Sequence, residues 1–132
     1  MTVKTYGLTH CALAVRDPHR SASFYAAVFG AVVVFDQPDF VPVQTPGCRD
    51  VLVFERDEAH AGRKGGVLHV GFRLLHPGDI EIAAQAVTAA GGQITSRGEF
   101  CPGEPYLFFR DPDGYEVEIW YELPTPVDLV IR

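Results

Sequence analysis

Residues 8–30, LTHCALAVRDPHRSASFYAAVFG, contain the pattern that decides the fold of this chain. The first part of this stretch alternates in the manner of a β-strand, with His10 on the face opposite Leu13 and Val15. A turn at Asp17-Pro18 follows, and the next apolar residues recur at helical spacing up to Gly30. The stretch therefore predicts a strand followed by a short amphipathic helix, capped near Ser21 and ended at Gly30.

Three short strand-like runs follow this helix, at residues 31–36, 40–47 and 50–55, separated by proline and glycine turn signals. The first half of the chain therefore has the order βαβββ.

The second half repeats the same order. A strand at residues 65–75 precedes a turn and a helix-forming stretch at residues 80–92. Three more strand-like runs follow at residues 93–100, 105–111 and 115–122. His10 lies 20 residues before Gly30, and His69 lies 22 residues before Gly91. This near-equal spacing indicates an internal repeat of roughly 55 to 60 residues.

The repeat predicts an α+β fold in which two βαβββ modules form a cupped mixed sheet. We expect one domain over residues 1–132, with the first module at about 5–56, a linker at about 57–65 and the second module at about 66–123. The tail from residue 124 is expected either to extend across a partner or to fray.

The composition excludes several classes of protein. A formal charge of −6 without a cluster of lysines or arginines argues against nucleic acid as a partner. No apolar run approaches the roughly 18 residues that cross a bilayer, so we expect a cytoplasmic protein without a membrane partner. Three cysteines without CxxC spacing favour reduced thiols over disulfides or a structural zinc site.

Strand alternation predicts the functional site. His69 lies on the face opposite Val70 and Phe72, and Glu118 lies on the face opposite Val117 and Ile119. If the bulky apolar faces pack on the helices, both polar side chains line the hollow of the sheet. His10 occupies the matching position in the first module. Two imidazoles and one carboxylate are a sufficient set of ligands for a divalent metal, with positions left open for water and substrate.

Other polar residues are candidates for the pocket. Arg73 shares the face of His69 and could clamp a carboxylate, while Tyr106 or Tyr121 could hydrogen-bond or protonate a ligand oxygen. The alternative roles are an ion pair between Arg73 and Glu116, and tyrosines packed at a dimer seam. Glu118, Tyr106 and Arg73 are thus the predicted catalytic residues, beside the metal ligands His10, His69 and Glu118.

The chain resembles the vicinal oxygen chelate superfamily, which includes glyoxalases, fosfomycin and bleomycin resistance proteins and extradiol dioxygenases. The resemblance covers about residues 6–122. The motifs on which it rests are, in order, LTHCALAVRD, SASFYAAVFGA, GGVLHVGF and FFRDPDGYEVEIWYE. It implies a glyoxalase-like fold, a bound divalent metal (Zn, Ni, Mn or Fe), a homodimer, and a lyase or isomerase acting on a small substrate with neighbouring oxygens. The metal then acts as a Lewis acid.

The resemblance leaves other functions open. Glyoxalase I takes a further glutamate from the first module, where the only nearby candidate, Glu55, lies beyond the ligand position, so its role as a fourth ligand stays open. A non-haem iron extradiol-type dioxygenase is one alternative, although Phe108 stands where those enzymes carry a tyrosine. A metal-free drug-binding protein of the bleomycin resistance kind is the other.

Overall fold

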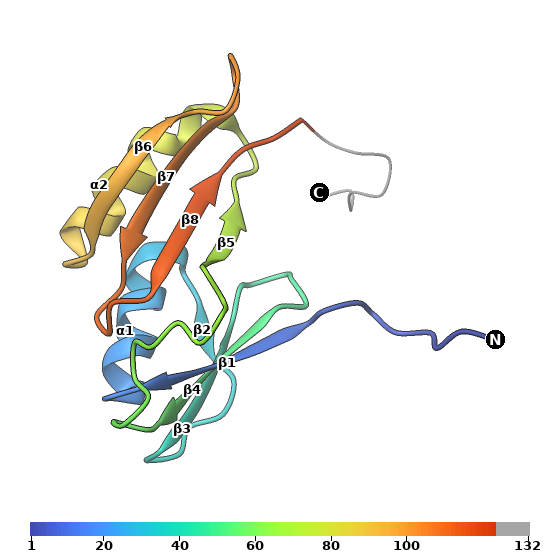
Figure 1. Cartoon of the computed structure of the whole chain (residues 1–132), viewed down its shortest axis with the longest axis vertical. Helices are drawn as coiled ribbons and strands as arrows, with labels where there is room; N and C mark the ends of the chain where they lie inside the picture. Colours follow the sequence, from blue (N-terminus) through green and yellow to red (C-terminus); the bar gives the residue numbers. More distant parts are fainter. Residues whose placement is uncertain (124–132) are drawn as a thin grey trace.

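The computed structural model describes residues 1–123 and divides the chain into two similar halves (Figure 1). The first half contains, in order, β1 (His10–Val15), α1 (Pro18–Phe29), β2 (Val32–Val33), β3 (Phe40–Gln44) and β4 (Val51–Arg56). Its four strands form one sheet in the order β1-β4-β3-β2, in which β1 is parallel to β4 and the other pairs are antiparallel.

The second half repeats this topology. Its elements are β5 (Val70–Arg73), a 3-10 turn (Pro77–Asp79), α2 (Ile80–Ala89), β6 (Gln93–Glu99), β7 (Pro105–Arg110) and β8 (Glu116–Trp120). The sheet order is β5-β8-β7-β6, again with one parallel pair, β5 and β8. The two βαβββ modules and the α+β class predicted from the sequence are therefore confirmed. Within the described residues, each module keeps its strands in a hydrogen-bonded sheet of its own.

Several elements are shorter than the sequence predicts. Strand β1 begins at His10, although the first module was expected to begin at about residue 5. Strand β5 begins at Val70 and not at residue 65, so that His69 lies just before the strand. Strand β2 contains only two residues, both exposed, although the apolar run continues to Phe35. Neither helix in the described part of the chain is long and apolar enough to cross a membrane.

Helix α1 is capped by Asp17 and not by Ser21. The Asp17 carboxylate accepts hydrogen bonds from the backbone N–H groups of His19 and Arg20, and Pro18 takes the first helical position, where no N–H is needed. Ser21 lies one turn further on and is fully buried. At the other end Gly30 adopts φ 70°, the left-handed conformation that commonly ends a helix, as predicted.

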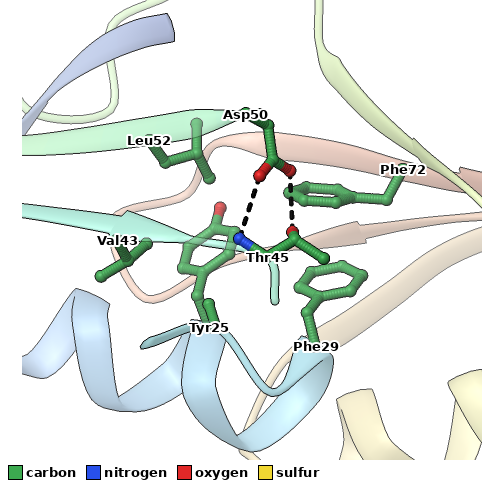
Figure 2. Close-up of a pocket in the computed structure, with 8 residues that line it drawn as sticks. Tyr25, Phe29, Val43, Thr45, Asp50, Leu52 and Phe72 are labelled. Atoms are coloured by element: carbon green, nitrogen blue, oxygen red, sulfur yellow. Dashed lines mark hydrogen bonds between the residues drawn. The ribbon is translucent and has the colours of Figure 1, made fainter. Parts of the chain in front are cut away.

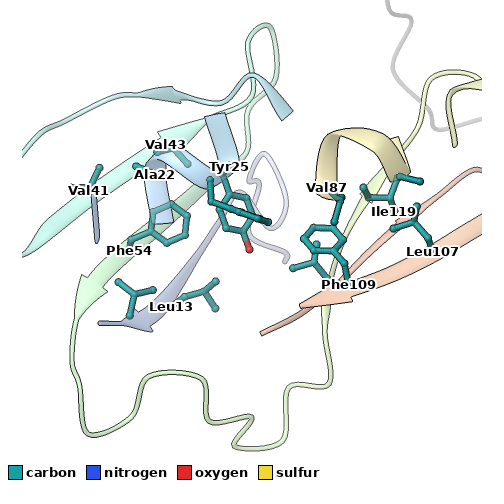
Figure 3. Packing of buried hydrophobic residues seen from close by; sticks show 14 residues of the cluster. Leu13, Ala22, Tyr25, Val41, Val43, Phe54, Val87, Leu107, Phe109 and Ile119 are labelled. Atoms are coloured by element: carbon teal, nitrogen blue, oxygen red, sulfur yellow. The ribbon is translucent and has the colours of Figure 1, made fainter. Parts of the chain in front are cut away.

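A single cluster of buried side chains spans both modules (Figure 3). Tyr25 of α1 is central to it, because its ring lies 5.2 Å from that of Phe54 in the first sheet and 6.3 Å from that of Phe72 in the second. Phe29 and Phe72 stack with their ring centroids 3.9 Å apart, which joins α1 directly to β5. Neither module therefore has a core that is independent of the other.

The packing between the modules is close. Around Tyr25, Phe29 and Phe72 it leaves a pocket of only about 10 Å³, beside hydrogen bonds that Asp50 accepts from the backbone and hydroxyl of Thr45 (Figure 2). A space of this size holds at most one water molecule. A substrate site must therefore lie elsewhere.

The turn before β8 is fastened to the first module by two buried carboxylates. The Asp111 carboxylate accepts a hydrogen bond from the Tyr25 hydroxyl at 2.9 Å. It also accepts hydrogen bonds from the backbone N–H groups of Asp113 and Tyr115. Burial raises the pKa of Asp111, and the hydrogen bonds that it accepts offset part of this increase.

Asp113 accepts more bonds from the first module. Its side chain is fully buried. The carboxylate accepts hydrogen bonds from the Arg16 backbone N–H, from the guanidinium groups of Arg16 and Arg20, and from the Ser21 hydroxyl. The start of β8, and with it the position of Glu118, is thereby fixed relative to α1.

We expect Asp113→Ala to destabilise the protein by about 2–4 kcal/mol, because it leaves the buried Ser21 hydroxyl and the partly buried Arg16 N–H without an acceptor, and two arginines without this partner. Urea denaturation followed by circular dichroism measures this change. The matched control is Asp39→Ala, which breaks an exposed ion pair with Arg56 and should change stability by less than about 1 kcal/mol. Equal effects of the two substitutions would contradict the assigned role of Asp113.

Candidate metal and substrate site

The second sheet presents one face to the core and the other outward, as strand alternation predicts. In β8, Val117 and Ile119 are buried in the core cluster, while Glu116, Glu118 and Trp120 are only partly buried. The neighbouring strands keep the same parity, since Glu118 pairs with Gly71 on one side and with Phe108 on the other. Glu118 therefore lies in the middle of the outward face.

Two of the three predicted metal ligands lie together on this face. The Nε2 atom of His69 is 3.7 Å from an Oε1 oxygen of Glu118. The His69 side chain is 37% exposed and that of Glu118 is 12% exposed. Burial raises the pKa of Glu118, and the nearby imidazole offsets only part of this increase.

The third predicted ligand, His10, lies on the other sheet. It opens β1, pairs with Val51 and is exposed. Across residues 1–123, no three histidine, cysteine or acidic side chains gather closely enough to hold a metal ion. An imidazole nitrogen and a carboxylate are donors that suit a borderline divalent metal, so the pair fits such an ion once a third ligand joins it.

The strand register also locates the counterpart of Glu118 in the first module. Ala12, two residues after His10, pairs with Val53, just as Gly71, two residues after His69, pairs with Glu118. Val53 therefore occupies the position that corresponds to Glu118. Glu55 lies two residues further along β4 and is exposed, which agrees with its expected place beyond the ligand position.

Arg73 forms an ion pair with Glu122 and not with Glu116, the partner expected from the sequence. Its guanidinium lies 3.5 Å from Glu122, and Glu116 instead pairs with Lys64 of the linker at 3.3 Å. The expected alternative of an Arg73–Glu116 pair is therefore wrong. The reason is that the linker brings Lys64 to the start of β8, while Arg73 lies opposite Trp120 at the end of that strand.

A row of aromatic rings begins beside His69. The Phe108 ring meets the His69 ring edge-on at 5.1 Å, and Tyr106 lies 5.8 Å beyond Phe108 and stacks on Phe100 at 4.4 Å. Tyr106 thus shares the outward face with Glu118, whereas Tyr121, the other tyrosine considered, lies past the end of β8.

Two glycines make room for rings on this face. A Cβ atom on Gly71 would lie 2.5 Å from the Trp120 ring, and one on Gly98 would lie 3.0 Å from the Tyr106 hydroxyl oxygen. A glycine inside a strand and opposite a large aromatic residue is a sequence signal for such a close approach. Neither Gly71 nor Gly98 was predicted from the sequence as part of the site.

The chain belongs to the glyoxalase, bleomycin resistance protein and dioxygenase superfamily, whose family model matches residues 7–119. The structure resembles a glyoxalase-related enzyme from Fulvimarina pelagi, with a TM-score of 0.73, 22% identity and 89% of each chain covered. It also resembles a lactoylglutathione lyase from Agrobacterium tumefaciens, with a TM-score of 0.69, 17% identity, and 89% of this chain and 94% of that one covered. These likenesses confirm the glyoxalase-like fold.

A curated relative is similar in sequence. It is a manganese-dependent 2,3-dihydroxybiphenyl 1,2-dioxygenase from Geobacillus genomosp. 3, 26% identical over 128 residues. The match covers 96% of this chain, which spans only 40% of the length of that relative. The superfamily therefore contains enzymes, some of which use a metal.

We expect the variant Glu118→Gln to be at least as stable as the wild type at pH 7 when both are free of metal. A carboxyl whose pKa is raised by folding stabilises the folded state most when it is protonated, and this contribution is lost as the pH rises through the raised pKa. Glutamine removes the charge that folding disfavours. Thermal unfolding in the presence of a chelator between pH 4 and pH 8 measures the effect. A clear loss of stability at pH 7 would show that Glu118 has a structural role.

Proposed function

We propose that the protein is a metal-dependent enzyme of the glyoxalase type that acts on a small substrate with two neighbouring oxygens, in a lyase or isomerase reaction. The observation that carries this proposal is the His69–Glu118 pair, in which an imidazole faces a partly desolvated carboxylate on an otherwise aromatic surface. A divalent ion (Zn, Ni, Mn or Fe) bound there would supply a Lewis acid for the substrate oxygens.

We further propose that His10 of a second copy completes the site in a homodimer. This chain holds His69 and Glu118 on one sheet and His10 on the other, so a two-fold dimer can bring the ligands together twice. The segment before β1 and the region of β2 both expose apolar side chains that contact with a second copy could bury: Val3, Tyr6, Leu8, Val32, Val33, Val34 and Phe35.

The remaining residues of the face have roles that follow from their positions. The hydroxyl of Tyr106 could donate a proton or a hydrogen bond to a substrate oxygen, because its ring lies on the same side of the sheet as Glu118. Arg73 could orient an anionic substrate group if it exchanged its long contact with Glu122 for a substrate carboxylate. Phe108 and Trp120 would keep water away from the reacting atoms.

Elemental analysis of protein purified without a histidine tag is expected to find about one divalent ion per chain, since one set of ligands exists for each chain. His10→Ala, His69→Ala and Glu118→Ala should each weaken metal binding at least about 100-fold, because each removes one of three protein ligands. His19→Ala is the matched control, because His19 is exposed and pairs with Asp36. Full metal content in the Glu118→Ala variant would contradict the proposed site.

Mixing two variants tests whether the site forms between copies. Refolding His10→Ala together with Glu118→Ala should restore metal to about a quarter of the wild-type level, because half of the dimers are mixed and each mixed dimer has one intact site. Each variant refolded alone serves as the control. If all three ligands came from one chain, the mixture would bind no more metal than the two variants do separately.

An extradiol-type dioxygenase is the second candidate, favoured by the aromatic face around His69 and Glu118. Flat aromatic substrates stack well on such rings. Oxygen uptake with simple catechols, after loading with iron or manganese, separates this reaction from lyase or isomerase chemistry. A metal-free drug-binding protein is less well supported, because such a protein gains nothing from a partly buried carboxylate whose pKa is raised.

A further inference from the structure

A second cavity lies between the two modules, away from the close packing around Tyr25. Its volume is about 310 Å³, which lies within the range of small-molecule sites in proteins. Strand β1 forms one wall through residues 11–14, and the linker and the approach to β5 form the others through residues 60–70. Figure 1 shows this linker crossing from the first sheet to the second. Both β1 and β5 are edge strands of their sheets.

The inside of the cavity is largely apolar. Ala12, Leu13 and Ala14 line it from β1, and Val67 and Leu68 line it from the approach to β5. Val67 is 61% exposed and Leu68 is 69% exposed. Two large aliphatic side chains on a cavity wall that are open to solvent suggest an apolar occupant that would cover them.

The floor of the cavity is fixed by a hydrogen bond. The Tyr115 hydroxyl donates to the backbone oxygen of Ala14 at 2.7 Å, which holds the turn before β8 against β1. The cavity is thus supported on both sides by elements that the core holds in place.

Basic groups dominate the rim, although the whole chain carries a net charge of −6. Among the described residues, one acidic side chain, Glu116, lines the cavity. The four basic side chains that line it are His60, Arg63, Lys64 and His69. Lys64 is paired with Glu116 at 3.3 Å, and His60 is bonded to Asp57 at 2.9 Å.

Arg63 is the basic group that is left available. Its side chain makes no ion pair or hydrogen bond with any of residues 1–123. A guanidinium binds a carboxylate through two parallel hydrogen bonds, and one unpaired guanidinium balances one negative charge.

From these features we infer that the cavity between β1 and the linker binds a small monocarboxylate with an apolar body. The apolar part lies against Ala12, Val67 and Leu68, and the carboxylate pairs with Arg63 at the rim. A dianionic phosphate fits less well, because among residues 1–123 the cavity lining offers one unpaired guanidinium and largely apolar walls. The cavity shares His69 with the proposed metal site but not Glu118, and pairing of a carboxylate with Arg63 requires no metal ion.

Calorimetric titration of the chelator-treated full chain with hexanoate tests the inference. We expect saturable binding to the wild type, weakened about tenfold or more in Arg63→Gln and largely retained in Arg63→Lys. Ala12→Leu, which fills part of the cavity, should also weaken binding. Arg97→Gln is the matched control, because Arg97 pairs with Glu81 on the distant strand β6 and should leave binding unchanged.

The uncharged analogue hexanamide separates charge recognition from simple apolar binding, and it should bind at least about tenfold more weakly than hexanoate. The inference would be overturned by a lack of saturable hexanoate binding, by equal binding of the amide, or by unchanged binding in Arg63→Gln. Measuring metal content in Arg63→Gln keeps the two proposals apart, because this variant should bind metal as the wild type does.

Discussion

The buried carboxylate of Asp113 is the interaction on which the arrangement of the two modules depends. It belongs to the turn before β8, yet its hydrogen-bond donors all come from the first module, where Arg16, Arg20 and Ser21 surround it. An unpaired charge in that position would be strongly disfavoured, so the turn is held against the start of α1. Asp111 supports the same contact through Tyr25, whose ring is also central to the shared core.

This fastening has a direct consequence for the candidate site. Strand β8 begins five residues after Asp111, and its alternation then directs Glu118 away from the core and toward His69. The carboxylate is kept partly buried there without a strong ionic partner, which raises its pKa. Such an arrangement lowers stability and is typical of a site prepared for a ligand. The first module lacks this feature because Val53 occupies the corresponding position.

Much of this structure could be predicted from the sequence, because its main signals are local. The helix stop at Gly30 and the near-equal spacing from His10 and His69 to the following helix-end glycines predicted the two modules. Alternation in β1 and β8 predicted the outward face of Glu118. The N-cap of α1 was misassigned, since Ser21 serves a carboxylate almost a hundred residues away. Long-range partners of this kind leave no local pattern. The separation of His10 from His69 has the same origin, because it depends on how the two sheets pack.

The proposed metal site has two imidazoles and one carboxylate, with His69 and Glu118 among its ligands. X-ray absorption spectroscopy of the zinc-loaded protein tests this claim most directly, because backscattering from imidazole rings reports the number of histidine ligands. We expect two imidazoles with the remaining ligands oxygen, and one imidazole in the His10→Ala variant under metal excess. Sulfur ligands, or a wild-type spectrum without imidazole, would contradict it.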